Sequence, residues 1–151
     1  MPTAELKKFL DSHRVKYLTI KHSPSYTAQE VAASAHVPGN SMAKTVIVKL
    51  DGTMAMMVEP ASHKVNFDRL KTQTGAKEIE LASESEFQQR FPECELGAMP
   101  PFGNLYGMAV YVADSLSASG EITFNAGTHS ELIKMTYDDF NRLVSPKVIS
   151  I

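Results

Sequence analysis

The chain has a single cysteine, no tryptophan, and no apolar run long enough to cross a membrane as a helix. The lone Cys94 excludes an internal disulfide and is typical of a reducing compartment. Residues 1–5 lack the basic and apolar pattern that opens a secretory signal peptide. We therefore expect a cytoplasmic protein with no membrane partner.

The chain also lacks a large excess of positive or negative charge. The formal net charge is −2, although residues 1–77 hold 11 of the 15 Lys and Arg and only 6 of the 17 Asp and Glu. Such an asymmetry can mark a basic face, but chain halves interleave in most folds, so a mixed solvated surface is the simpler interpretation. The small negative net charge does not support a protein that binds duplex nucleic acid, and we expect no DNA partner.

The familiar metal and nucleophile motifs are missing as well. No His-Glu-x-x-His or Cys-x-x-Cys occurs, and His13, His22, His36 and His63 are not paired at ligand spacing. There is no Gly-x-Ser-x-Gly elbow, phosphate-binding P-loop or dinucleotide fingerprint, and the acidic neighbours of Cys94 oppose thiolate formation. We therefore expect no metal and no cofactor. A nucleophile-based enzyme and a metal-dependent hydrolase are both disfavoured.

The sequence does contain an irregular alternation of helix and strand patterns. Apolar residues make up 43% and charged residues 21%, as in ordinary globular proteins, and the length fits one domain over residues 1–151. Apolar spacing, capping boxes and turn residues predict helices over 3–13, 27–38, 66–75, 83–91 and 136–143, and strands over 15–21, 45–50, 54–59, 107–113, 121–125 and 131–136. Asp51-Gly52 is the strongest hairpin signal. We therefore predict an α+β fold, in which helices pack on a mixed sheet rather than on a doubly wound parallel one.

Residues 97–103, GAMPPFG, predict a stiff loop. Its two prolines fix φ and cannot donate to a sheet ladder, whereas its two glycines can adopt backbone angles that are closed to other residues. The N–H groups of Gly97 and Ala98 could then face a ligand with no side chain in the way. Taken alone, the segment is more typical of a Pro-rich surface turn.

Two polar residues accompany this loop. Lys44 stands where the chain enters an apolar strand, and alternation along a strand can bury such a lysine in part. A poorly solvated ammonium is a strong partner for an oxyanion or phosphate, although a lysine that snorkels at a strand end is the commoner arrangement. His129 follows Ala126-Gly127-Thr128 between two predicted strands, where a lone histidine is usually an ordinary surface residue.

These segments, in this order, resemble the YbaK/prolyl-tRNA synthetase-associated editing domain family of small aminoacyl-tRNA deacylases, which are free-standing or inserted into a synthetase. The matching segments are HSPSYTAQEVA (22–32), AKTVIVKLDG (43–52), GAMPPFG (97–103) and FNAGTHSEL (124–132). No single motif is decisive, but the ordered set with near-family spacing is much more specific. The resemblance implies a curved mixed sheet that closes toward a barrel and is flanked by helices.

The resemblance also implies a function and a site. The function is hydrolysis of the ester that links a small mischarged amino acid to the terminal ribose of a tRNA. The implied partners are the aminoacyl-tRNA acceptor end and an aminoacyl-tRNA synthetase, and a protein that grips only an RNA end needs few basic residues. Lys44 falls on the essential lysine of the family, and the backbone of Gly97 would hold the ester or its oxyanion. The implied substrate-binding residues are Tyr26, Thr27, Ala98, Met99, Pro100, Phe102, Gly127 and His129.

An aminoacyl ester is already activated, so such a site needs only to position a water and stabilise the developing oxyanion, without a metal. A ribose hydroxyl of the substrate could help to activate that water. The main alternative is a non-catalytic module that binds an amino acid, a tRNA end or a synthetase, with the same pocket and no turnover. Intact Lys44 and Gly97 favour the enzyme. The sequence does not indicate which amino acid or which tRNA is used.

Overall fold

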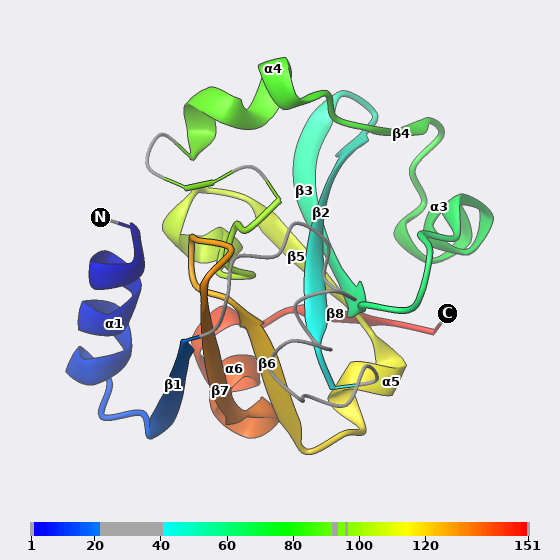
Figure 1. Cartoon of the computed structure of the whole chain (residues 1–151). Coiled ribbons are helices and arrows are strands. Elements are labelled where there is room, and N and C mark those ends of the chain that lie inside the picture. The colour runs from blue at the N-terminus through cyan, green and yellow to red at the C-terminus, as the bar shows by residue number, and fades with distance from the viewer. Residues whose placement is uncertain (1, 22–40, 92–93, 96, 151) are drawn as a thin grey trace.

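The computed structural model of the chain describes residues 2–21, 41–91, 94–95 and 97–150 (Figure 1). The helix predicted over 27–38, together with Tyr26 and Thr27, lies outside these residues. Within them, the strands are β1 (Tyr17–Lys21), β2 (Ala43–Leu50), β3 (Thr53–Pro60), β4 (Ile79–Leu81), β5 (Ala109–Ala113), β6 (Glu121–Asn125), β7 (Glu131–Thr136) and β8 (Lys147–Ile149). The helices are α1 (Pro2–Ser12), α3 (Phe67–Thr74), α4 (Glu84–Phe87), α5 (Asp114–Ser117) and α6 (Tyr137–Val144), with 3₁₀ turns at Gln88–Arg90 and Gly103–Leu105.

The described strands form two sheets. One is antiparallel with the order β1-β7-β6, and the other has the order β4-β2-β3-β5-β8. In the five-stranded sheet β4, β2 and β3 are antiparallel, whereas β3, β5 and β8 are parallel, so the predicted mixed sheet is confirmed. The predicted closure toward a barrel is wrong for these strands, because β4 and β8 stand as separate ends of the larger sheet. The two sheets meet instead where Met42 bridges to Thr123.

Helices α3, α4 and α6 begin at the capping residues that the sequence indicated, although α4 ends at Phe87 and a 3₁₀ turn replaces the rest of the helix predicted to Phe91. Asn66 accepts from the N–H of Arg69 at the start of α3, and Gly75 ends that helix with a left-handed φ of 75°. The side chain of Thr136 starts α6 in the same way. None of the helices that the structure describes is both long and apolar enough to span a membrane.

The hairpin between β2 and β3 fixes the positions on which the site depends. Asp51 and Gly52 have φ values of 50° and 85°, the left-handed pair that a tight two-residue hairpin requires. Leu50 therefore pairs with Thr53, and counting back along both strands pairs Lys44 with Glu59.

The two faces of β2 pack against different apolar clusters. Ala43 and Ile47 belong to the larger core, which fills the space between the sheets, whereas Val48 belongs to a smaller core with Met57 and Leu70. Because side chains alternate along a strand, consecutive residues of β2 serve opposite faces of the sheet.

Candidate functional site

The loop that carries Gly97 is held against the loop that carries His129. The N–H of Glu95 donates to the carbonyl of Gly127, and the N–H of Gly127 donates to the carbonyl of Ala98, each at 2.9 Å. Gly97 has a left-handed φ of 84°, and a Cβ added there would lie 3.4 Å from Cε1 of His129. The structure therefore brings Gly97, Gly127 and His129 together, as the sequence predicted.

The backbone donors of this loop differ from expectation. The N–H of Ala98 donates to the carbonyl of Glu95 at 3.0 Å, so it is not free for a ligand. The N–H of Gly97 has no acceptor among the described residues. Within the described part of the chain, only the Gly97 donor of the predicted pair has no acceptor, because the tight turn uses the N–H of Ala98 to close itself.

Two predicted pocket residues lie deeper than expected. Phe102 is fully buried, and its ring packs within 5.5–6.1 Å, centre to centre, of Phe9, Phe124 and Phe140. Pro100 is buried as well. Phe102 therefore fills the aromatic core behind the loop, because an apolar ring of this size gains most from complete burial.

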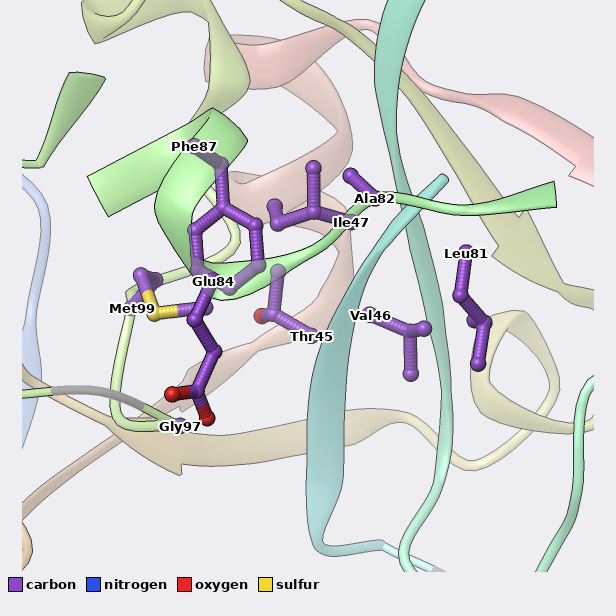
Figure 2. A pocket seen from close by; sticks show the side chains of 9 residues that line it. All are labelled: Thr45, Val46, Ile47, Leu81, Ala82, Glu84, Phe87, Gly97 and Met99. Carbon is purple, nitrogen blue, oxygen red and sulfur yellow. The ribbon is translucent and has the colours of Figure 1, made fainter. Parts of the chain in front are cut away.

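A hollow of about 260 Å³ opens beside Gly97, and we call it the Gly97 hollow (Figure 2). Its lining residues come from β2, from the β4–α4 segment and from the loop: Thr45, Val46, Ile47, Leu81, Ala82, Glu84, Phe87, Gly97 and Met99. In Figure 2 the rings and methyl groups of Phe87, Ile47 and Met99 gather on one side, and the carboxylate of Glu84 points toward the Gly97 end. The hollow thus combines apolar walls with one carboxylate.

Helix α4 is fixed at this position by two sets of contacts. Ser83 and Glu86 form a capping box, in which each side chain accepts from the backbone N–H of the other. Lys49 on β2 lies 2.5 Å from Glu86 and 3.1 Å from Glu80. The bonds from Lys49 and Ser83 lower the pKa of Glu86 to about 2, so the link between α4 and the sheet stays charged.

Lys44 lines a second hollow of about 360 Å³, which we call the Lys44 hollow. Its other lining residues are Val46, Lys64, Val65, Phe67 and Leu81. The structure therefore does not place Lys44 and Gly97 in one hollow, since Lys44 and Thr45 serve opposite faces of β2. The two hollows are neighbours, because Val46 and Leu81 line both.

The Lys44 side chain is held by protein acceptors. Its Nζ donates to the backbone carbonyl of His63 and lies 3.9 Å from Oε1 of Glu59. Glu59 is fully buried, and burial raises the pKa of its carboxyl, an effect that the charge of Lys44 and then that of His63 oppose. The lysine is 27% exposed, so its ammonium still reaches solvent.

Three polar residues of this region were missed by the sequence analysis. Glu59 could have been found, because it is the only charge in the apolar strand β3 and stands opposite Lys44 when residues are counted from Asp51-Gly52. Glu84 carried no signal of its own. Asn125, at the end of β6, has a buried Oδ1 with no hydrogen-bond partner in the described part of the chain.

The titratable side chain of Cys94 lies apart from both hollows, beside Tyr106. Cys94 is partly buried, and its Sγ lies 3.7 Å from Oη of Tyr106, whose pKa is raised mainly by burial. Over the residues described, no group of three His, Cys, Asp or Glu side chains could hold a metal ion.

A comparison with known families shows the family to which the chain belongs. The sequence model of the aminoacyl-tRNA editing domain matches residues 22–143. The chain belongs to this family. The matched range includes Lys44, Gly97 and His129 and the residues that line both hollows, so both hollows lie within the editing domain.

Relatives of this editing domain include full-length synthetases. Proline–tRNA ligases of Bacillus mycoides (strain KBAB4) and Bacillus cereus (strain G9842) are 30% identical to it over 91 residues, which are 60% of this chain. The match covers 16% of each ligase.

Solved structures share the fold of the editing domain. The hypothetical protein APE2540 superimposes with a TM-score of 0.85 at 19% identity, covering 97% of this chain and 99% of the other. A protein described as a candidate trans-editing enzyme for prolyl tRNA synthetase superimposes with a TM-score of 0.82 at 15% identity, covering 99% and 97%.

Proposed function

We propose that the protein hydrolyses the ester of mischarged aminoacyl-tRNA and so removes small amino acids from the tRNA acceptor end. The observation that carries the proposal is the Gly97 N–H, which has no acceptor within the described residues and lies on a left-handed glycine beside His129 and a hollow. A preorganised donor of this kind stabilises the oxyanion that develops when water attacks an ester. The match to the editing family supports the same reaction.

In this proposal the substrate spans both hollows. The amino acid enters the Gly97 hollow, which Met99 lines, and the ring of His129 lies next to Gly97 and supports the loop there. The terminal ribose and its phosphate lie in the Lys44 hollow, where Lys44 and Lys64 supply positive charge and Phe67 offers an aromatic face to a base. The family resemblance assigns substrate binding to Tyr26 and Thr27 as well, which lie outside the described residues.

The chemistry assigned to the chain is positioning and charge stabilisation. Lys44 anchors the acceptor end, Gly97 holds the oxyanion, and a ribose hydroxyl of the substrate orients the attacking water. No covalent nucleophile and no metal take part, because the ester bond is already activated. The cellular partners in this proposal are aminoacyl-tRNA and an aminoacyl-tRNA synthetase.

Deacylation assays with a panel of mischarged tRNAs test the proposal. We expect release of free amino acid at a rate that is proportional to enzyme concentration. Saturable binding of aminoacyl-tRNA without any release would instead identify the protein as a non-catalytic module.

The size of the Gly97 hollow predicts which esters are hydrolysed. About 260 Å³ is below the usual range of small-molecule pockets, and Ile47, Phe87 and Met99 wall it with bulky side chains. We expect hydrolysis of alanyl, seryl, cysteinyl or 2-aminobutyryl esters, with overlap among them, because one methylene changes binding by only about 1–3 kcal/mol. Leucyl and phenylalanyl esters should survive. Equal rates for seryl- and phenylalanyl-tRNA at matched enzyme concentration would show that the hollow does not select amino acids by the size of their side chains.

Glu84 gives the Gly97 hollow a preference for a charged α-amino group. Its carboxylate points toward the Gly97 end, where the α-ammonium of an aminoacyl ester would lie in this proposal (Figure 2). We expect Glu84→Gln to raise KM about tenfold for seryl-tRNA and to have little effect on an N-acetylated ester, which lacks the charge. Steady-state kinetics with both esters measure the difference, and Glu78→Gln, an exposed glutamate outside the hollows, is the control. An equal loss with both esters would exclude this role for Glu84.

A further inference from the structure

Glu59 is a buried carboxylate whose oxygens are not satisfied by hydrogen bonds. Its side chain is 0% exposed, and neither Oε1 nor Oε2 has a hydrogen-bond partner among the described residues. Folded proteins pair almost all such groups, because an unsatisfied buried charge opposes folding. The 3.9 Å between Glu59 Oε1 and Lys44 Nζ exceeds hydrogen-bond length, so the two groups interact through charge alone.

The backbone sets this pair up. Glu59 and Lys44 are opposite each other in the antiparallel register of β2 and β3, and the Asp51-Gly52 turn fixes that register. The carbonyl of His63 accepts from the same ammonium. A lysine side chain is long and flexible, so holding its ammonium in one place requires such partners.

We propose that Glu59 is the positioning residue of Lys44. The carboxylate of Glu59 holds the ammonium of Lys44 at the edge of the Lys44 hollow, in the orientation that meets the substrate. This inference rests on the proposed function, because it assigns Lys44 a role in the reaction. Glu59 is itself sealed from solvent and does not touch the substrate.

This arrangement predicts that the rate of the reaction falls as the pH is lowered from neutral into the acidic range. Burial raises the pKa of Glu59, so this carboxyl takes up a proton at a higher pH than an exposed glutamate does. Among the residues that the structure describes, the charged groups that act on it are Lys44 from β2 and His63 from the segment after β3; α5 also packs on β3 and begins with the acidic Asp114. Strand β5 contributes no charged side chain. When Glu59 is protonated, Lys44 loses its counter-charge and its fixed orientation.

The test compares the wild type with Glu59→Gln, which keeps the shape and removes the charge. We expect the single-turnover rate of Glu59→Gln on a seryl ester to fall about 10- to 100-fold at neutral pH, as for a misplaced catalytic group. We also expect the rise of the wild-type rate from acid toward neutral pH to disappear. Glu59→Asp, which retains a carboxylate, should keep that rise. Glu121→Gln, which breaks the surface pair with Lys134 on the other sheet, is the matched control and should behave as the wild type.

Stability provides a readout that does not depend on turnover. A carboxyl whose pKa is raised on folding binds its proton more tightly in the folded state, so the free energy of unfolding of the wild type falls as pH rises through and above the ordinary value of 4.5. Glutamine does not ionise, so this fall should be smaller in Glu59→Gln. Denaturant unfolding from about pH 4.5 to pH 8 measures the difference.

Amine labelling provides the second readout. We expect Glu59→Gln to raise the rate at which Lys44 is modified relative to exposed Lys77, because the ammonium is released. An unchanged pH profile together with unchanged Lys44 labelling would overturn the inference. If the wild type hydrolyses no ester, the proposed function fails, and labelling and unfolding still decide whether Glu59 holds Lys44.

Discussion

Replacing Lys44 by alanine is expected to abolish deacylation. The ammonium lines a hollow that it shares with Lys64, and it is the anchor proposed for the acceptor end. Losing an electrostatic contact of this kind costs about 100-fold or more in rate. Single-turnover deacylation with the variant in excess over substrate measures the chemical step directly. Wild-type turnover by a well-folded Lys44→Ala protein would contradict the assignment.

The contacts of Lys44 determine which control variants the Lys44→Ala experiment needs. Lys44→Ala leaves the buried carboxylate of Glu59 without its cation, so we expect a loss of about 1–3 kcal/mol in the free energy of unfolding. The double variant Lys44→Ala/Glu59→Gln should recover much of this stability and remain inactive, which separates folding from catalysis. Lys147→Ala removes the same side chain from strand β8 of the same sheet, where it is exposed and outside both hollows, and should retain activity.

Replacing Gly97 by valine is expected to damage the chemical step more than substrate binding. The backbone at Gly97 is left-handed, and its Cβ would already lie 3.4 Å from the ring of His129 before a β-branch is added. A β-branched side chain is strained at this φ and adds methyl groups beside the ring, so we expect the loop to shift, together with the N–H that is proposed to hold the oxyanion. Loss of one such donor lowers the rate about 100- to 1,000-fold. Binding affinity and single-turnover rate should be measured separately.

Gly120→Val is the matched control for this substitution. Gly120 has nearly the same φ, 83° against 84°, but nothing lies within 4 Å of an added Cβ. Both variants carry the strain of a side chain in the left-handed region, about 1–2 kcal/mol, so only the loss specific to Gly97 reports on the site. If binding alone weakens at Gly97→Val and the chemical step is unchanged, the oxyanion role is wrong.

Most of the described elements could be predicted because their signals are local. The strands at Glu121–Asn125 and Glu131–Thr136 begin and end as predicted, and so does the helix capped by Asn66 and Gly75. The sequence missed β4, α5 and β8, which have three or four residues each. Such segments are too short to show a hydrophobic periodicity. They form because contacts with a neighbouring strand or with the core stabilise them.

The candidate site was predictable only in part. Sequence order indicated Lys44, Gly97 and His129, and in the structure the loops of Gly97 and His129 lie against each other, while their roles stay predictions. The sequence could not show that the N–H of Ala98 donates within its own turn, or that the ring of Phe102 points into the core. Both depend on how the whole chain packs. Burial is a property of the assembled fold, and a Pro-rich motif does not encode it.

Lys44 and Thr45 lie on opposite faces of β2, and this arrangement constrains where insertions and deletions can occur in the protein. A single-residue insertion or deletion within β2 would exchange the two faces of the strand, moving the lysine into the larger core and an apolar residue to the Lys44 hollow. A two-residue change would restore the faces but break the pairing with Glu59. Length variation among relatives that keep this chemistry should therefore accumulate at the Asp51-Gly52 turn and spare the strand before it.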